Sequence, residues 1–371
     1  MGDGLGSQGL EVRIAEPGEI ARIAELKSRV WEGAPQERWG ERWPWQFRNH
    51  PMRPARHASN FMIAEVGGRL VGGIGWMPTQ LVVDGKEHES AFTCDGFVDP
   101  ELQRGGVGKA MFDAVLREYP ASLWMKTSVA LTRYLEKNGF TRIEPVNFLA
   151  LPLDPGGALR ARGWTGLGAL TGWARGPIHA LVRARARSFG APGGISLSAG
   201  SSFGEEFDRL CETLDSSSRV RPRRDAAYLR WRYVDCPFGN YRVRVARSGR
   251  DLVGFVVWRA WTAPNGRLGM VNELAAHPRF PGVGEALLAD ALLDLLEQGV
   301  ELVKALAPDT STRLLFRRLG FIRSRRTPNL FVAPGAVERL GLPRSGAQWC
   351  LSVGDCDLDY EFDSPSAPGP R

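Results

Sequence analysis

The chain is 371 residues long, with 43% apolar and 24% charged residues. That length favours two domains over one, and the apolar content excludes a wholly disordered chain. No apolar run approaches the ~18 residues of a membrane span. Met1–Gln8 is polar and Gly-rich, without the apolar segment of a secretory signal. We therefore expect no membrane span and a cytoplasmic location.

The cysteines and histidines show no metal-binding or disulfide pattern. Five cysteines are scattered along the chain with no CxxC pair, and the five histidines have no metal-type partner at short spacing. These spacings argue against a disulfide framework and a structural zinc site, so we predict no metal. The cysteines are Cys94, Cys211, Cys236, Cys350 and Cys356.

The net charge of +7 is unevenly distributed. Six arginines lie between Asp154 and Gly190, and six more between Arg219 and Arg232. Basic surfaces attract nucleic acid, anionic membranes or phosphate-rich cofactors, but solvated helix faces and ion pairs give the same composition. The acidic segment Asp355–Asp363 lacks the glycine and terminal glutamate of an EF-hand, so we expect an edge strand or a docked tail.

In chain order, the predicted elements occur twice. A first helix, hairpin strands (one at Gly68–Trp76), a longer strand ending at Asp95–Pro100, a glycine loop and an apolar helix are followed by strand, helix and strand. The second pass repeats the hairpin at Arg250–Trp258, the strand at Glu273–Pro278 and the glycine loop at Gly282–Gly284. Each pass closes on Gly-Phe, at Gly139 and at Gly320. The chain is therefore two copies of one module.

The repeat predicts an α/β (α+β type) fold, each module having a mixed, largely antiparallel sheet flanked by helices. We expect the first module at residues 11–153, a basic helical linker at 154–194, the second module at 195–334 and an acidic C-terminal segment at 335–371. Ile178, Leu181 and Val182 have helical spacing within that linker, and Pro/Gly breaks lie at both of its ends.

The first glycine loop has the composition of an anion-binding turn. It follows a strand and opens a helix, and its residues are Gln103, Arg104, Gly105, Gly106, Val107, Gly108 and Lys109. Glycine lets the backbone approach a ligand closely, and the first helical N–H groups have no partner within the helix. These donors and the positive end of the helix suit a pyrophosphate.

These residues resemble the GNAT N-acetyltransferase superfamily. Val98–Gly108 is similar to its acyl-CoA signature, V-x-P followed by (Q/R)-x-x-G-x-(G/A), and Tyr134–Phe140 is similar to its later YEKxGF element. The second module repeats both motifs. The resemblance implies acetyl-CoA as co-substrate, with the Gln103–Lys109 loop holding the phosphates. It also implies that Phe97 and Val98 offer backbone groups to the pantetheine and the acyl carbonyl.

The catalytic candidates lie in the first module. Pro281 in the second loop cannot donate an N–H, so we favour the first loop for acyl-CoA. The resemblance places a general-acid tyrosine at Leu135, one position from Tyr134, which makes Tyr134 the candidate acid or else a half-buried core tyrosine. Asp95, near the expected splay of the strands, is the candidate base, or else a carboxylate bonded to a buried arginine or to loop amides. Its repeat counterpart is Glu273.

Two aromatic segments allow two interpretations each. Trp31, Trp39, Trp43, Trp45 and Phe47 follow the first helix and would line an acceptor site or pack the two modules together. The Arg/aromatic helix Arg224–Tyr233 would line an anionic acceptor pocket or bind the acidic tail. The sequence does not decide either question.

These observations favour an acyl-CoA-dependent N-acyltransferase that transfers acetyl from acetyl-CoA to a small-molecule amine by direct attack. One alternative is a non-catalytic CoA-binding or structural tandem protein. Another is an aminoacyl-tRNA-dependent transferase, which the arginine clusters would suit although we do not expect a nucleic-acid partner. The acceptor, the acyl length and the oligomeric state cannot be read from the sequence.

Overall fold

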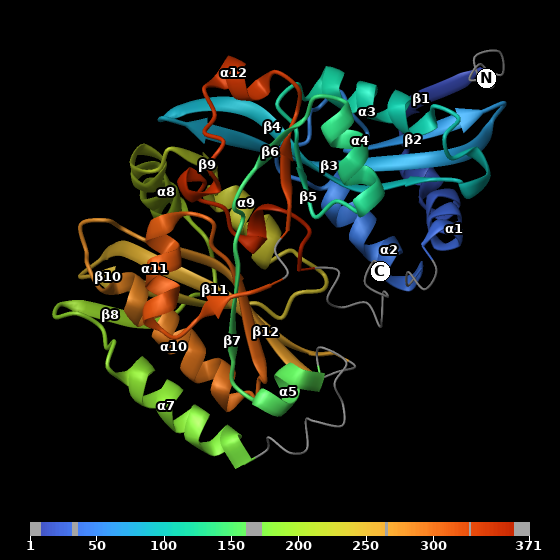
Figure 1. Ribbon diagram of the computed structural model, residues 1–371. Helices are drawn as coiled ribbons and strands as arrows, with labels where there is room; N and C mark the ends of the chain where they lie inside the picture. The colour runs from blue at the N-terminus through green and yellow to red at the C-terminus, as the bar shows by residue number, and fades with distance from the viewer. Residues whose placement is uncertain (1–8, 32–35, 161–172, 264–265, 326–327, 360–371) are drawn as a thin grey trace.

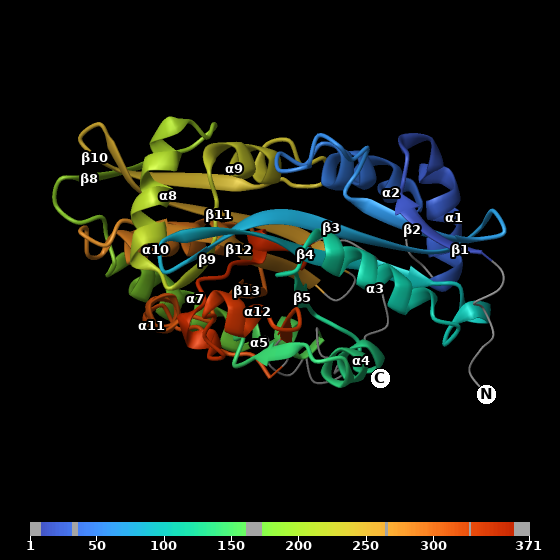
Figure 2. The same ribbon diagram turned by 90° about the horizontal axis from the view of Figure 1, so that it is seen from above.

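The computed structural model describes residues 9–31, 36–160, 173–263, 266–325 and 328–359. Two mixed sheets lie side by side, and helices cover them on both sides (Figures 1 and 2). The predicted fold class is confirmed. No described helix is long and apolar enough to cross a membrane.

The N-terminal half builds most of the first sheet. Its long hairpin turns at Asp84 and Gly85, both with positive φ (46° and 79°), as a two-residue hairpin turn between twisted strands requires. Its elements are β1 (Leu10–Ile14), α1 (Ile20–Val30), α2 (Gln36–Trp43), a π-helix (Pro44–Arg48), β2 (Phe61–Val66), β3 (Arg69–Val83), β4 (Lys86–Val98), α3 (Val107–Glu118), β5 (Leu123–Met125), α4 (Val129–Lys137) and β6 (Thr141–Ile143).

The rest of the chain, from residue 148 on, adds a strand and two helices and then repeats this order from residue 195 on. Helix α10 is buried over most of its surface because it packs between β11 and α7, which explains its nearly continuous apolar sequence. The elements are β7 (Phe148–Pro152), α5 (Pro155–Arg160), α7 (Arg175–Arg187), β8 (Ile195–Ala199), α8 (Glu205–Ser217), β9 (Val220–Pro222), α9 (Ala226–Tyr233), β10 (Arg242–Ser248), β11 (Asp251–Ala263), β12 (Gly266–Ala276), α10 (Val283–Glu297), β13 (Leu302–Leu306), α11 (Thr310–Arg318), β14 (Ile322–Arg323), β15 (Leu330–Val332) and α12 (Ala336–Leu340).

The two sheets exchange strands between the halves of the chain. The first sheet has the order β1-β2-β3-β4-β5-β15-β6, with β9 of the C-terminal half paired to β3 outside this order. The second sheet has the order β14-β7-β13-β12-β11-β10-β8. Strand β7 leaves the N-terminal half and lies between β13 and β14, whereas β15 returns from the C-terminal half to lie between β5 and β6 (Figure 1). Each sheet is therefore incomplete without a strand from the other half of the sequence.

A pair of tryptophans joins the two modules. The Trp45 and Trp231 rings stack with their centroids 4.7 Å apart and an interplanar angle of 13°. Each indole N–H donates to the other residue's backbone carbonyl, at 2.9 Å in both directions. The reciprocal bonds show that Trp45 and Trp231 occupy equivalent positions in the two copies, a similarity that the sequence motifs did not reveal.

Replacing Trp45 by Ala removes a stacked ring that is 5% exposed and leaves a buried carbonyl of Trp231 without its donor. We expect the free energy of unfolding to fall by about 3–5 kcal/mol, as for other buried tryptophans. Trp173 is 79% exposed, and its replacement by Ala should change stability by less than about 0.5 kcal/mol. Urea denaturation measures both; equal losses would mean that the stacked pair does not hold the modules together.

Candidate functional site

A bulge in β4 opens the first sheet. Opposite Gly73, Ile74 and Gly75 of β3, strand β4 carries one extra residue, and Asp95 adopts φ 51°. Within the described strands, parallel pairing of β4 with β5 is confined to Phe92 and Thr93. From Cys94 to Val98, β4 therefore has β3 on one side and free backbone groups on the other. Phe97 and Val98 lie in this segment.

The glycine loop lies directly beyond this free edge. Arg104 and Gly106 have positive φ, 70° and 89°, which turns the chain sharply into α3. The first intrahelical bond is donated by Ala110 to the Gly106 carbonyl, so the amides of Val107, Gly108 and Lys109 precede it at the positive end of the helix. Gln103, Arg104, Gly106 and Lys109 are exposed, whereas Val107 is buried. The loop can receive an anion.

The second loop is covered where the first is open. A Cβ on Gly106 would meet nothing within 4 Å, and one on Gly108 would lie 3.8 Å from the nearest atom. In the second module a Cβ on Gly284 would lie 2.5 Å from Leu315, and one on Gly282 would lie 3.2 Å from Pro192. Helix α11 and the segment before β8 therefore occupy the space above the second loop.

The C-terminal segment fills the free edge of the second sheet. Cys350–Ser352 lie beside β12 and β13, and the Ser352 hydroxyl donates to Glu273 at 2.8 Å. The cavity left there has a volume of about 20 Å³, which is room for about one water molecule. Glu273, the counterpart of Asp95, is thus enclosed by the chain itself.

Asp95 is held by two cations. The Lys27 ammonium lies 2.6 Å from one carboxylate oxygen, and the Arg42 guanidinium lies 2.7 Å from the other. Burial alone would raise the pKa of Asp95, but the charges of Arg42 and Lys27 outweigh burial and lower it. Asp95 is therefore ionised, and both of its oxygens are paired with cations. One of these cations is an arginine, as one of the alternatives from the sequence had it.

Lys27 stands in an aromatic enclosure. Its ammonium lies 3.4 Å from the ring centroid of Trp39 and 4.7 Å from that of Trp31. Burial lowers the pKa of Lys27 to about 8, although Asp95 opposes the shift. Trp43 and Phe47 instead pack on Phe61 inside the module. The aromatic segment thus serves both the charged cluster and, through Trp45, the contact between modules.

Tyr134 lies on another side of the module, against the α3 helix. Its ring centroid is 5.1 Å from that of Phe112. Burial raises the pKa of Tyr134, and the nearby Asp113 adds to the shift. Tyr134 therefore keeps its proton at neutral pH. Among the described contacts, none joins Tyr134 to Asp95.

The sequence did not identify the second acidic residue of the site. Asp357 of the C-terminal segment lies 3.5 Å from Arg42, and its carboxylate, that of Asp95 and the Cys94 sulfur have atoms within 4.8 Å of one another. Burial, and then the charge of Asp95, raises the pKa of Asp357. Unlike Asp95, the Asp357 side chain is 21% exposed. Alternating carboxylates marked the tail, but nothing in the sequence placed it beside β4.

Two buried ion pairs fix this tail. Arg224 binds Asp355 through two bonds of 2.7 and 2.6 Å. Arg232 donates to Asp359 at 2.6 Å, and Tyr241 donates to the other oxygen of that carboxylate at 2.7 Å. The tail therefore docks on the Arg/aromatic helix, as one of the two interpretations had it. The acidic residues Glu361 and Asp363 lie outside the described residues.

Cys94, Asp95 and Asp357 have the identities of metal ligands but poor chemistry for a cation. Lys27 and Arg42 already bind the Asp95 oxygens. Burial raises the pKa of the Cys94 thiol well above its usual range, so no thiolate is available. The donor set fits an internal ion-pair cluster.

Comparison with known proteins agrees with this geometry. Residues 11–141 match the family model of the acetyltransferase (GNAT) domain. A GCN5-related N-acetyltransferase from Anabaena variabilis superposes with a TM-score of 0.58 at 12% identity, covering 87% of this chain and 72% of that one. A GCN5-related N-acetyltransferase from Kribbella flavida superposes with a TM-score of 0.58 at 15% identity, covering 87% of this chain and 70% of that one. Saccharomyces cerevisiae N-myristoyltransferase with bound myristoyl-CoA superposes with a TM-score of 0.57 at 13% identity, covering 89% of this chain and 83% of that one.

No curated protein sequence matches the chain. The family match covers the N-terminal module, which is a GNAT acetyltransferase domain. The two halves together share the fold of the GCN5-related N-acetyltransferases from Anabaena variabilis and Kribbella flavida.

The Lys27–Asp95 pair can be tested by a double-mutant cycle. Lys27→Met leaves a buried carboxylate with Arg42 as its remaining cation, and we expect the free energy of unfolding to fall by about 3 kcal/mol. Adding Asp95→Asn removes the uncompensated charge, so the double variant should be more stable than Lys27→Met alone. Urea denaturation measures all four proteins; additive losses would show that the two residues do not interact.

Proposed function

We propose that the first module transfers an acyl group from acyl-CoA to an amine. The observation that carries the proposal is the difference between the two copies. In the first, the glycine loop and the edge of β4 are open, whereas in the second Leu315 and Pro192 cover the loop and Cys350–Ser352 fill the edge. A donor with a long pantetheine arm fits the first copy.

The donor would lie along the free edge of β4. The amides of Arg104 and of residues 106–109, with the positive end of α3, would bind its pyrophosphate, because the Gln103 and Gly105 amides already donate to backbone carbonyls. Lys109, which pairs with Asp113 at 2.6 Å, would add a positive charge at the loop. Backbone groups of Phe97 and Val98 would pair with the pantetheine amides. The acyl carbonyl would then lie near the bulge at Asp95. The bound myristoyl-CoA of the yeast N-myristoyltransferase supports a thioester of CoA as the donor class.

The arginines between Arg219 and Arg232 lend little support to an aminoacyl-tRNA donor. Arg221, Arg224 and Arg232 are at most 2% exposed, and the last two bind the tail. Arg223 pairs with Glu87 of β4. These side chains hold the protein together and offer no open phosphate-binding surface.

The donor site is tested by titrating acetyl-CoA calorimetrically into wild type, Gly106→Trp and Gly282→Trp. The two glycines are equivalent and have φ of 89° and 87°, so both variants carry the same backbone strain. We expect one site in wild type, lost in Gly106→Trp and kept in Gly282→Trp. Gly85→Trp, in an open turn with φ 79°, controls for strain. Loss in Gly282→Trp alone would place the donor in the second module, and no binding would refute the proposal.

Asp357 is the proton acceptor that the geometry favours. When the amine nitrogen bonds to the thioester carbon, the C–S bond breaks, the thiolate leaves, and the nitrogen must lose a proton. Asp95 has both oxygens paired with cations, whereas Asp357 is partly exposed and has a raised pKa. Asp357 would accept the proton, directly or through water. Tyr134, which keeps its proton, is the candidate donor to the thiolate.

The role of Asp357 predicts a particular pH dependence. Because the carboxylate is active and its pKa is raised, kcat/KM should fall as pH drops through that raised pKa. Asp357→Asn should lower kcat/KM by about 10²–10⁴-fold and abolish this acid limb, with acetyl-CoA affinity unchanged. Thiol release with a panel of primary amines, amino sugars and peptides provides the assay.

Asp359→Asn is the matched tail control. Asp359 is fully buried with Arg232, so its loss should cost about 3–5 kcal/mol of stability but leave the acid limb in place. An acid limb that survives in Asp357→Asn would assign the proton transfer to another group.

A further inference from the structure

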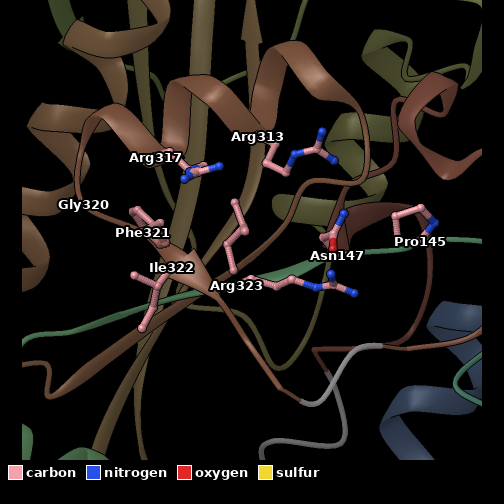
Figure 3. A pocket seen from close by; sticks show the side chains of 9 residues that line it. Pro145, Asn147, Arg313, Arg317, Gly320, Phe321, Ile322 and Arg323 are labelled. Atoms are coloured by element: carbon pink, nitrogen blue, oxygen red, sulfur yellow. The ribbon is translucent and has the colours of Figure 1, made fainter.

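A second open cavity lies in the C-terminal module, away from the free edge of β4. Its volume is about 690 Å³. Arg313 and Arg317 of α11 line it from one side, and Arg323 of β14 and Asn147 before β7 line it from the other (Figure 3). Leu149 and Phe321 add apolar surface. The cavity therefore lies where the exchanged strand β7 enters the second sheet.

Asn147 lacks the partners that its counterpart has. Asn329 stands just before the other exchanged strand, β15; its side chain accepts from the Thr127 amide at 2.8 Å and donates to the Thr132 hydroxyl at 2.8 Å. When the two modules are aligned on their shared Gly-Phe, Pro308 stands at the position of Thr127 and Arg313 at that of Thr132. Pro308 has no N–H to donate.

The Asn147 side chain is consequently left with its hydrogen-bonding groups toward the cavity. Asn147 as a whole is 2% exposed, and its side chain lines the cavity (Figure 3). A ligand in the cavity can therefore bond to the Asn147 amide, which offers both a donor and an acceptor.

The positions that surround this cavity carry different charges in the two modules. In the first module Arg142 is neutralised by Glu144 at 2.7 Å and by Glu136 at 3.8 Å. Four equivalent positions carry Thr132, Glu136, Arg142 and Glu144 in the first module and Arg313, Arg317, Arg323 and Arg325 in the second. Among the described residues, no carboxylate pairs with these four arginines. Two acids and one base of the first module are thus replaced by four bases in the second, and three of these, Arg313, Arg317 and Arg323, line the cavity.

We propose that this cavity binds a phosphate-bearing small molecule of about nucleotide size. Arginine guanidinium groups match phosphate oxygens in bidentate geometry, and three of them converge here from two elements. Arg313 is already oriented by bonds to the Pro308 carbonyl and the Thr310 hydroxyl at 3.1 and 3.2 Å. Asn147 would bond a polar group of the ligand, and Leu149 and Phe321 would pack on its apolar part.

The site is tested by titrating ADP and inorganic pyrophosphate into Gly106→Trp, whose first glycine loop is blocked. We expect one site that binds ADP more tightly than pyrophosphate, because the apolar wall contacts only the nucleoside. In the same background, Arg313→Thr/Arg317→Glu restores the residues of the first module and should weaken ADP binding at least tenfold. Asn147→Leu should weaken it several-fold without adding charge.

Arg250→Glu is the charge control, because Arg250 is exposed and lies outside the cavity. Melting temperatures verify that each variant is folded. The proposal is overturned if ADP does not bind, if Arg250→Glu weakens ADP binding as much as Arg313→Thr/Arg317→Glu does, or if that double variant binds ADP normally. Because Gly106 is blocked throughout, these outcomes are independent of whether the first module uses acyl-CoA.

Discussion

The exchange of β7 and β15 constrains the whole structure. Each strand completes the sheet of the other half, so neither half can close its sheet alone. The stacked Trp45 and Trp231, bonded reciprocally through indole and carbonyl, then hold the two copies together. Because the copies are interlocked, the segments that follow the second sheet are held close to the first module, and the tail can reach the first module's bulge.

That constraint explains how equivalent positions have come to differ in role. In the second copy Glu273 is enclosed by Ser352 and Arg224, and the tail fills the space beside it. The same tail then continues to Asp357 in the first copy. The filled edge of the second sheet thus serves as the anchor for a segment that shapes the first.

Much of the fold could be predicted from the sequence, and the reasons are local. The repeated Leu-Val-Gly hairpins, glycine loops and Gly-Phe endings are short-range signals, and they predicted two modules of the right class. The strand exchange could not be predicted, because β7 and β15 follow the same motif in each copy and pairing within a copy would satisfy the same pattern. The sequence offered a buried arginine as one partner of Asp95 but could not identify Lys27 or Arg42, because those cations are 68 and 53 residues away.

The electrostatics of the first site depend on which carboxylate is left incompletely paired. Asp95 binds two cations at 2.6 and 2.7 Å, so giving it a proton would break strong bonds in a buried place. Asp357 lies at the margin of the same cluster, 3.5 Å from Arg42, and burial, followed by the charge of Asp95, raises its pKa. A carboxylate that is already costly to ionise accepts a proton with little disturbance of its neighbours. Asp95 therefore fixes the charge of the cluster, and Asp357 is the group whose protonation that charge controls.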